Sequence, residues 1–288
     1  MTNTWHDTVR NYIEILKPRE TSLIVLIGAC AAVLAGDGHP PLDRLVLVLV
    51  ALLFASAGAN GLTNYLDRHI DAKMQRTRHR VLPSKRIHPA EKVLPLILSL
   101  FIAGLSLAWY LHFFCFLAGL GGTLAAIVWR KRWTCVFPQG VLASCAPALA
   151  AWFAIRASPS WLLISLCLVI AIWVPLHLWS IMITWRDDYL GAGISFFPLN
   201  LKTDEAAKIL VGLSLLLYSA SIAACFISKS SWISVVMVNL MGIILVYTSI
   251  RLATSISSKR SWRLYKLSAF PYMGLVFMAM CLDTLVRG

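Results

Sequence analysis

Charged residues are scarce in this sequence. Only 14% of its 288 residues are Asp, Glu, Lys or Arg, and 59% are hydrophobic, whereas an ordinary soluble domain has roughly 45–50% apolar residues. Apolar stretches such as LVLVLVALLFASAGANGL are close to the length of about 20 residues that a helix needs to cross a bilayer. The composition therefore excludes a soluble domain and predicts an all-α, polytopic membrane protein.

Three other patterns are missing. The seven cysteines show no CxxC spacing and mostly stand singly in apolar segments, so we interpret them as small buried hydrophobic residues. No HxxxH pair or Cys/His cluster suggests zinc. The polar first twenty residues lack the apolar core of a signal peptide, so we expect the mature chain to begin at Met1. Because no tail or long linker interrupts the apolar segments, we expect residues 1–288 to form a single transmembrane domain.

The apolar segments divide into nine predicted transmembrane helices. Their approximate ranges are 20–36, 44–63, 92–110, 112–129, 137–155, 160–183, 206–228, 232–253 and 267–286. A polar segment that contains acids follows the second span (NYLDRHID) and another follows the sixth (WRDDYLGAG). Both segments lie on the same side of the membrane, so their acids can face one another if the helices close into a ring.

The basic residues are distributed unevenly between the two sides. Of the 26 lysines and arginines, 22 lie in the N-terminal segment and the loops after spans two, four, six and eight, or within three residues of those loops. The positive-inside rule places these regions in the cytoplasm and the C-terminus outside. We therefore expect an integral protein of a bacterial cytoplasmic membrane. The net charge of +13 then reflects topology and attraction to anionic lipid, and it gives no reason to expect a nucleic acid partner.

The charged stretch NYLDRHIDAKMQRTRHRVLPSKR occupies residues 64–86. Asp67 and Asp71 are four residues apart, so on a helix they share a face, and Asn64 joins that face. Two neighbouring carboxylates at a membrane boundary are unfavourable unless a cation compensates them. Mg²⁺ is usually held by one or two carboxylates and completed by substrate phosphate oxygens and water. The stretch therefore predicts a Mg²⁺ site for a phosphorylated substrate.

Cations that suit a diphosphate follow the two acids. Arg76 and Arg80 are again four residues apart, and Thr77 adds a hydroxyl. Arginine side chains match phosphate oxygens with two hydrogen bonds. Lys131 and Arg132 lie in the next loop of the same side. Surface ion pairs and the positive-inside rule could also explain the arginines, but carboxylates contribute little to topology.

These residues resemble the first aspartate-rich motif of the UbiA-type intramembrane prenyltransferases. The continuation DxxIDxxMxRTxxRxLP is similar, more specifically, to the protohaem IX farnesyltransferases, or haem O synthases. YIEILKPRETSLIVLIGA, KRWT and HLWSIMITWRDDYLGAGISFFPL resemble further segments of that family in the same order, between about residues 12 and 199. The resemblance implies nine helices in a UbiA-like bundle around a lateral cavity, Mg²⁺ as cofactor, farnesyl diphosphate and haem b as substrates, and haem O and diphosphate as products.

The resemblance also implies roles for individual residues. Asn64, Asp67 and Asp71 would hold Mg²⁺ on the diphosphate, and Arg76, Arg80, Lys131 and Arg132 would contact its phosphates. Asp188 would supply a second acidic site for metal and catalysis, with Tyr189 beside it and Asp187 as the alternative acid. His177 would be a candidate residue of the haem side, and a candidate axial ligand. The sequence departs from the family at RDDY, which leaves both acids open, and around Pro147 and Pro175 on the acceptor side.

Two alternative functions remain. A UbiA-type enzyme that prenylates a quinone precursor would share the diphosphate site, and the MxRTxxR continuation argues against it. A transporter would suit the many spans, the intramembrane His177 and helices broken at prolines. Transporter acids usually lie near the bilayer midplane, whereas the acids here cluster at one membrane face. Whether haem O would pass to a haem-modifying enzyme or a terminal oxidase as partner stays open.

Overall fold

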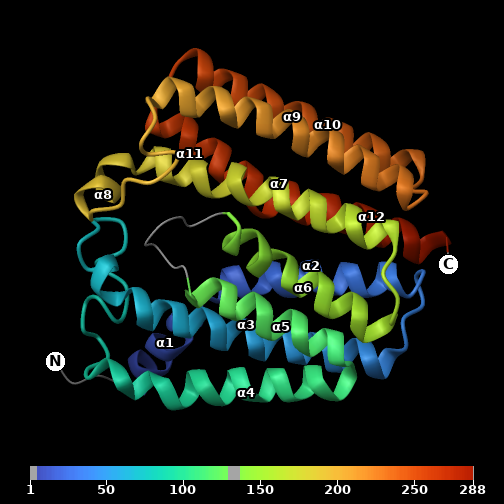
Figure 1. Cartoon of the computed structure of the whole chain (residues 1–288), viewed down its shortest axis with the longest axis horizontal. Coiled ribbons are helices and arrows are strands. Elements are labelled where there is room, and N and C mark those ends of the chain that lie inside the picture. The colour runs from blue at the N-terminus through green and yellow to red at the C-terminus, as the bar shows by residue number, and fades with distance from the viewer. Residues whose placement is uncertain (1–4, 129–136, 288) are drawn as a thin grey trace.

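The computed structural model describes residues 5–128 and 137–287, and within these ranges every regular element is a helix. The longer helices lie side by side along the long axis of the molecule (Figure 1). They are α2 (Pro18–Ala35), α3 (Leu42–Asp71), α4 (Leu94–Leu111), α5 (Phe113–Val128), α6 (Gln139–Ile155), α7 (Trp161–Thr184), α9 (Thr203–Ile227), α10 (Trp232–Thr254) and α12 (Leu275–Arg287). The shorter elements are α1 (Trp5–Ile15), η1 (Ala90–Val93), α8 (Arg186–Gly191), α11 (Ser258–Leu267) and η2 (Ser268–Gly274).

The described helices agree with a membrane protein. Seven of them, counting joined segments as one, are long and apolar enough to cross a bilayer, and α5 and α6 are shorter apolar helices on either side of residues 129–136. Each predicted span falls on one of these helices. Large apolar side chains also point outward from α9 and α10, among them Leu216, Leu240 and Ile243, as expected for helices that face lipid. The count of nine spans and the single-domain assignment stay predictions.

Two helix ends differ from the prediction. α3 has 30 residues and continues past the predicted end at residue 63 to Asp71, so the first acids lie on a helix and not in a loop. The last predicted span is interrupted: α11 meets α12 through η2, where Ala269 has ψ −128° and Pro271 lies inside the turn. Proline has no N–H to donate, which favours a kink at this point, and the non-helical ψ of Ala269 marks it.

Close helix contacts hold the first half of the bundle together. A Cβ on Gly58 would lie 2.7 Å from the backbone nitrogen of Phe101, and one on Gly104 would collide with the backbone of Ala55. Because glycine has no side chain, α3 and α4 can pack with their backbones nearly in contact. This packing fixes the direction in which α3 enters the polar end of the molecule.

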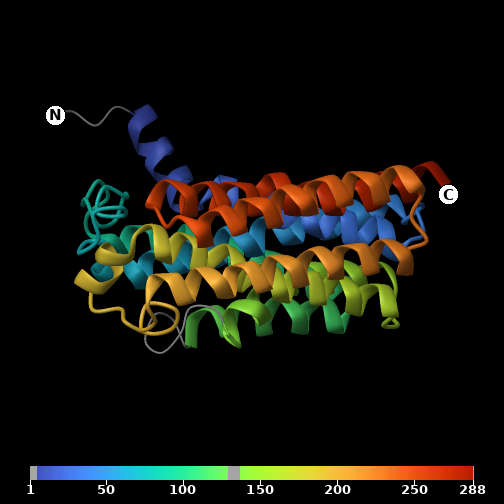
Figure 2. The same ribbon diagram turned by 90° about the horizontal axis from the view of Figure 1, so that it is seen from above.

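The polar segments gather at one end of the bundle. Figure 1 places α1, the α3–α4 connection, α8 and the beginning of α11 at the same end, while the C-terminus lies at the other, and Figure 2 shows the same separation from above. The structure thus brings together the connections after the second, sixth and eighth predicted spans. Which end faces the cytoplasm stays a prediction.

Candidate active site

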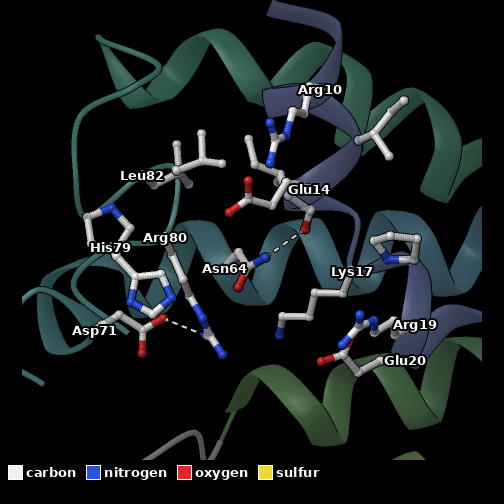
Figure 3. Close-up of a pocket in the computed structure, with 15 residues that line it drawn as sticks. Arg10, Glu14, Lys17, Arg19, Glu20, Asn64, Asp71, His79, Arg80 and Leu82 are labelled. Carbon is white, nitrogen blue, oxygen red and sulfur yellow. Dashed lines mark hydrogen bonds and ion pairs between the residues drawn. The ribbon is translucent and has the colours of Figure 1, made fainter. Parts of the chain in front are cut away.

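A polar pocket of about 570 Å³ opens beside the last turns of α3. α1, the beginning of α2, α3 and the loop of residues 72–89 form its walls (Figure 3). Its charged and polar lining residues are Arg10, Glu14, Lys17, Arg19, Glu20, Asn64, Asp71, His79 and Arg80. The pocket therefore combines two of the predicted α3 ligands with several cations.

The acids of α3 are buried. Asp67 is 4% exposed and Asp71 is 1% exposed, and buried carboxylates are stable only when they are paired. Asp71 Oδ2 accepts a hydrogen bond from Arg80 Nη1 at 2.9 Å. Asn64 Nδ2 donates to the carbonyl oxygen of Ile15 at 2.6 Å, which directs the amide oxygen away from α1 (Figure 3).

The loop after α3 is held by its own side chains. Thr77 is fully buried, and its hydroxyl donates to the carbonyl oxygen of Asp71 at 3.0 Å. The amide of Arg80 in turn donates to the carbonyl oxygen of Thr77 at 3.0 Å. A substrate contact by Thr77 would require its hydroxyl bond to break, and this contact stays a prediction. In the present geometry Thr77 stabilises the turn that carries Arg80.

The second acidic segment meets this loop but not the α3 acids. Asp188 Oδ1 accepts the amide of Gln75 at 2.6 Å and Asp188 Oδ2 accepts the amide of Arg76 at 3.0 Å. Arg76 Nη2 donates to the Tyr189 hydroxyl at 3.2 Å. Asp187 is exposed. No group of three or more His, Cys, Asp or Glu gathers as a metal site among the residues described, so Asp67, Asp71 and Asp188 do not form one cluster.

The acceptor-side candidate His177 is packed among aromatic rings. Its ring stacks on Trp173 at 4.8 Å and on Tyr265 at 4.4 Å between centroids. His177 Nδ1 lies 3.0 Å from Ser268 Oγ, and the Ser268 hydroxyl donates to the carbonyl oxygen of Tyr265 at 3.0 Å. When the Ser268 hydroxyl donates to Tyr265, His177 donates from Nδ1 and Nε2 carries the lone pair.

This tautomer suits a metal ligand, because ligating histidines usually donate their other ring N–H to an oxygen atom. The same contacts also satisfy a buried histidine, so haem ligation stays a prediction. Two other predicted site residues, Lys131 and Arg132, lie outside the described residues.

Comparison with known proteins decides the family. A sequence profile described as the UbiA prenyltransferase family matches residues 22–275. The chain belongs to the UbiA prenyltransferase family. It is 31% identical to the protoheme IX farnesyltransferase of Desulforudis audaxviator over 98% of this chain and 91% of that protein. It is 32% identical to the protoheme IX farnesyltransferase of Korarchaeum cryptofilum over 95% of this chain and 93% of that protein.

Solved structures confirm the UbiA-like fold. A digeranylgeranylglyceryl phosphate synthase superposes with a TM-score of 0.76 at 14% identity, covering 96% of this chain and 99% of the other. A UbiA homologue from Archaeoglobus fulgidus bound to GPP and Mg²⁺ superposes with a TM-score of 0.62 at 16% identity, covering 94% and 99%. The predicted all-α membrane bundle of a UbiA-type prenyltransferase is therefore correct.

The α3 residues of this UbiA-family chain fit a magnesium ion. Asp67 and Asp71 lie on successive turns of one helix, Asp71 and Asn64 line the pocket, and Asn64 turns its amide oxygen away from α1 (Figure 3). Mg²⁺ prefers such hard oxygen ligands and completes its shell with phosphate and water. A third carboxylate is not required, so the separate position of Asp188 does not conflict with this site.

Sequence reasoning missed Lys17 as a residue of the polar pocket. Lys17 adopts a left-handed backbone conformation with φ 50° just before Pro18 begins α2. Its side chain extends into the pocket (Figure 3), with Nζ 3.4 Å from Thr63 Oγ1. The KPR segment of the sequence was the available signal, but nothing in its spacing predicts a contact with the end of α3.

The N-terminal helix is tied to the same loop. Arg86 Nη2 contacts Glu14 Oε1 at 2.6 Å and Arg86 Nη1 donates to Asn11 Oδ1 at 2.9 Å. Ile15 also belongs to a small buried cluster with Val81 and other apolar residues of the loop and of η1–α4. α1 is therefore a fixed wall of the pocket and brings Arg10 to its lining.

Proposed function

We propose that this UbiA-family chain is a haem O synthase. It would transfer the farnesyl group of farnesyl diphosphate to a vinyl group of haem b, with addition of water, and release diphosphate. The observation that carries this proposal is the near full-length similarity to relatives named protoheme IX farnesyltransferase, at 31% and 32% identity. The MxRTxxR continuation lies in the loop that lines the polar pocket, next to the buried acids.

The pocket suits the leaving group of this reaction. Ionisation of an allylic diphosphate moves negative charge onto the leaving diphosphate, and fixed donors are most effective where that charge develops. When bound, Mg²⁺ would neutralise part of this charge. Asp71 fixes Arg80 at the pocket wall, while Lys17 and Arg19 reach the pocket from the beginning of α2. These cations would bind and orient the phosphate oxygens.

The farnesyl cation must then reach its acceptor before water does. α7 is a mostly apolar helix that leads away from the polar end. Its residue His177 lies between aromatic rings. An apolar environment protects a reactive cation from hydrolysis, and the faces of aromatic rings attract cations. Haem b would bind on this side, with His177 Nε2 as the candidate ligand of its iron.

Location and partners form part of the proposal. The basic segments at the pocket end favour the cytoplasmic side of a bacterial cytoplasmic membrane for the N-terminus and the pocket, and the outside for the C-terminus. Haem O is itself a precursor or a cofactor, so a haem-modifying enzyme or a terminal oxidase would take up the product.

The decisive experiment uses the full chain in lipid nanodiscs. Incubation with haem b, farnesyl diphosphate and Mg²⁺ should give haem O by mass, and removal of Mg²⁺ with EDTA should stop its formation. A parallel reaction replaces haem b with 4-hydroxybenzoate or dihydroxynaphthoate. Prenylation of either aromatic acid without reaction of haem b would refute the haem assignment, and movement of a solute across vesicles without Mg²⁺ would favour a transporter.

A further inference from the structure

One carboxylate of α8, that of Asp188, binds the loop of residues 72–89. The two oxygens of Asp188 accept the successive backbone amides of Gln75 and Arg76, at 2.6 and 3.0 Å. Figure 1 shows this contact region at the polar end of the bundle, where α8 approaches the connection between α3 and α4. The contact joins segments 113 positions apart in the chain.

The other bonds of this turn explain why the carboxylate matters. The amides of Thr77 and Arg78 both donate to the carbonyl oxygen of Met74, at 3.1 and 2.8 Å. The amides of Gln75 and Arg76 instead point out of the turn toward α8. A carboxylate is an acceptor at both oxygens, and hydrogen bonds to an ionised acceptor are the stronger ones. Asp188 therefore supplies acceptors for the two amides that point out of the turn.

Apolar packing supports the same contact. Met74 is fully buried in a small cluster with Met182, Tyr189, Ile194 and Leu199. The guanidinium of Arg76 lies 5.7 Å from the ring centre of Tyr189, and its Nη2 donates to the hydroxyl of that tyrosine. Met74, which precedes the two amides, and the side chain of Arg76 are thus fixed to α7, α8 and the segment after α8.

Asp188 is placed differently from Asp71. Asp71 lines the polar pocket, whereas Asp188, like Asp67, is absent from the described lining. Asp188 also forms no cluster with two other acidic, histidine or cysteine residues in the described part of the chain. Each of its oxygens already accepts a backbone amide, so coordination of a metal would compete with the contact that holds the loop.

We propose that Asp188 is a positioning residue that clamps the 72–89 loop onto α8 and thereby sets Arg80 against Asp71 in the diphosphate pocket. The link runs through the turn: Arg76 is held by Asp188, Thr77 bonds to the carbonyl of Asp71, and Arg80 bonds to the carbonyl of Thr77. The part of this proposal that concerns substrate rests on the proposed function. The clamp itself does not.

The clamp is tested first without any substrate. Hydrogen exchange at Gln75 and Arg76 is measured by mass spectrometry in ligand-free nanodiscs for the wild type, Asp188→Asn and Asp204→Asn. Asparagine has only one acceptor oxygen, and its NH2 group cannot accept the second amide. Exchange of the amides of Gln75 and Arg76 should therefore become about tenfold faster or more. Asp204, an exposed acid at the beginning of α9, is the matched control and should leave exchange unchanged. Unchanged exchange in Asp188→Asn would overturn the clamp, whatever the substrate is.

Kinetics then separate positioning from metal binding. In Asp188→Asn the KM for farnesyl diphosphate should rise about tenfold, while the Mg²⁺ concentration for half-maximal rate stays that of the wild type. Asp188→Glu keeps both acceptor oxygens and should recover part of the lost affinity. A several-fold increase in the Mg²⁺ requirement of Asp188→Asn, with its KM for farnesyl diphosphate unchanged at saturating Mg²⁺, would identify Asp188 as a metal ligand and overturn the proposal. If Asp188→Asn does not fold, Asp188→Glu is measured in the same two assays, and the same increase in its Mg²⁺ requirement would overturn the proposal.

Discussion

The proposed donor region and the proposed acceptor region of this molecule are built from different interactions. The donor region comprises α1, the end of α3, the 72–89 loop and α8, and its side chains are joined by ion pairs and hydrogen bonds such as Arg80–Asp71 at 2.9 Å. The acceptor region lies where α7 meets α11 and η2, and there His177 is held between stacked rings. Ion pairs join the side chains of the first region, whereas the ring of His177 itself packs between two aromatic rings.

The two regions also differ in how sensitive they are to single changes. Removal of one partner of a buried ion pair commonly costs about 3–5 kcal/mol, because the other charge stays buried. Asp71 is buried, but the side chain of Arg80 is 31% exposed, so solvent should reduce that cost. An aromatic pair contributes about 0.5–1.5 kcal/mol beyond its buried area. We therefore expect substitutions in the donor region to lower the rate of prenyl transfer most. Those in the acceptor region should mainly weaken haem binding.

The largest effect is expected for the acids of α3. Asp67→Ala and Asp71→Ala should each lower the rate of prenyl transfer by about 10³-fold or more, because the charge on the leaving diphosphate is no longer neutralised. Haem binding, followed by its absorption spectrum, should stay that of the wild type. Asp43→Asn, at the exposed opposite end of α3, is the control. Wild-type turnover with a normal Mg²⁺ requirement in either alanine variant would show that the metal assignment is wrong.

An intermediate effect is expected in the acceptor region. His177→Ala should change the absorption spectrum of bound haem b, because the candidate ligand of the iron is lost. Ser268→Ala should weaken haem binding about tenfold, which is less than His177→Ala, since it removes only the partner of His177 Nδ1. Farnesyl diphosphate binding should be unaffected in both variants.

The control for the acceptor region is His39→Ala, an exposed histidine between α2 and α3. An unchanged haem spectrum in His177→Ala would remove His177 from the haem site. A loss of farnesyl diphosphate binding in the same variant would instead show that the two regions are not independent.

The smallest effect is expected for Lys17. Lys17→Met should raise the KM for farnesyl diphosphate about tenfold, which is the scale of one hydrogen bond to a charged group, with a smaller change in kcat. The haem spectrum should not change. Lys208→Met, at an exposed position of α9, is the matched control. Equal KM values for Lys17→Met and the wild type would place the diphosphate away from the N-terminal side of the pocket.

Parts of the donor region could be predicted from the sequence because they depend on local spacing. Asp67 and Asp71 are one helical turn apart, so any helix that includes both places them on one face. The structure shows that α3 includes both. The predicted spans could be found for a similar reason, since each apolar segment forms its own backbone hydrogen bonds. The exact end of α3 and the break at η2 were missed, because apolar composition does not mark where a membrane helix stops.

Contacts between distant segments could not be predicted. The sequence placed Asp188 near the α3 acids as a second acidic site, but it did not show that the carboxylate holds the amides of Gln75 and Arg76. It did not bring Lys17 to Thr63, or Ser268 to His177. Backbone amides have no signature in a sequence, so a side chain that binds them leaves no pattern to recognise.

The sequence by itself determined that this chain is a helical membrane protein with acids, arginines and a UbiA-like motif at one membrane face, because composition and spacing act within single segments. The tertiary structure alone decided which of those charges meet. Asp71 pairs with Arg80, Asp188 holds a loop, and the N-terminal helix closes a pocket. Helix packing sets these distances, and packing depends on side chains that lie far apart in the chain.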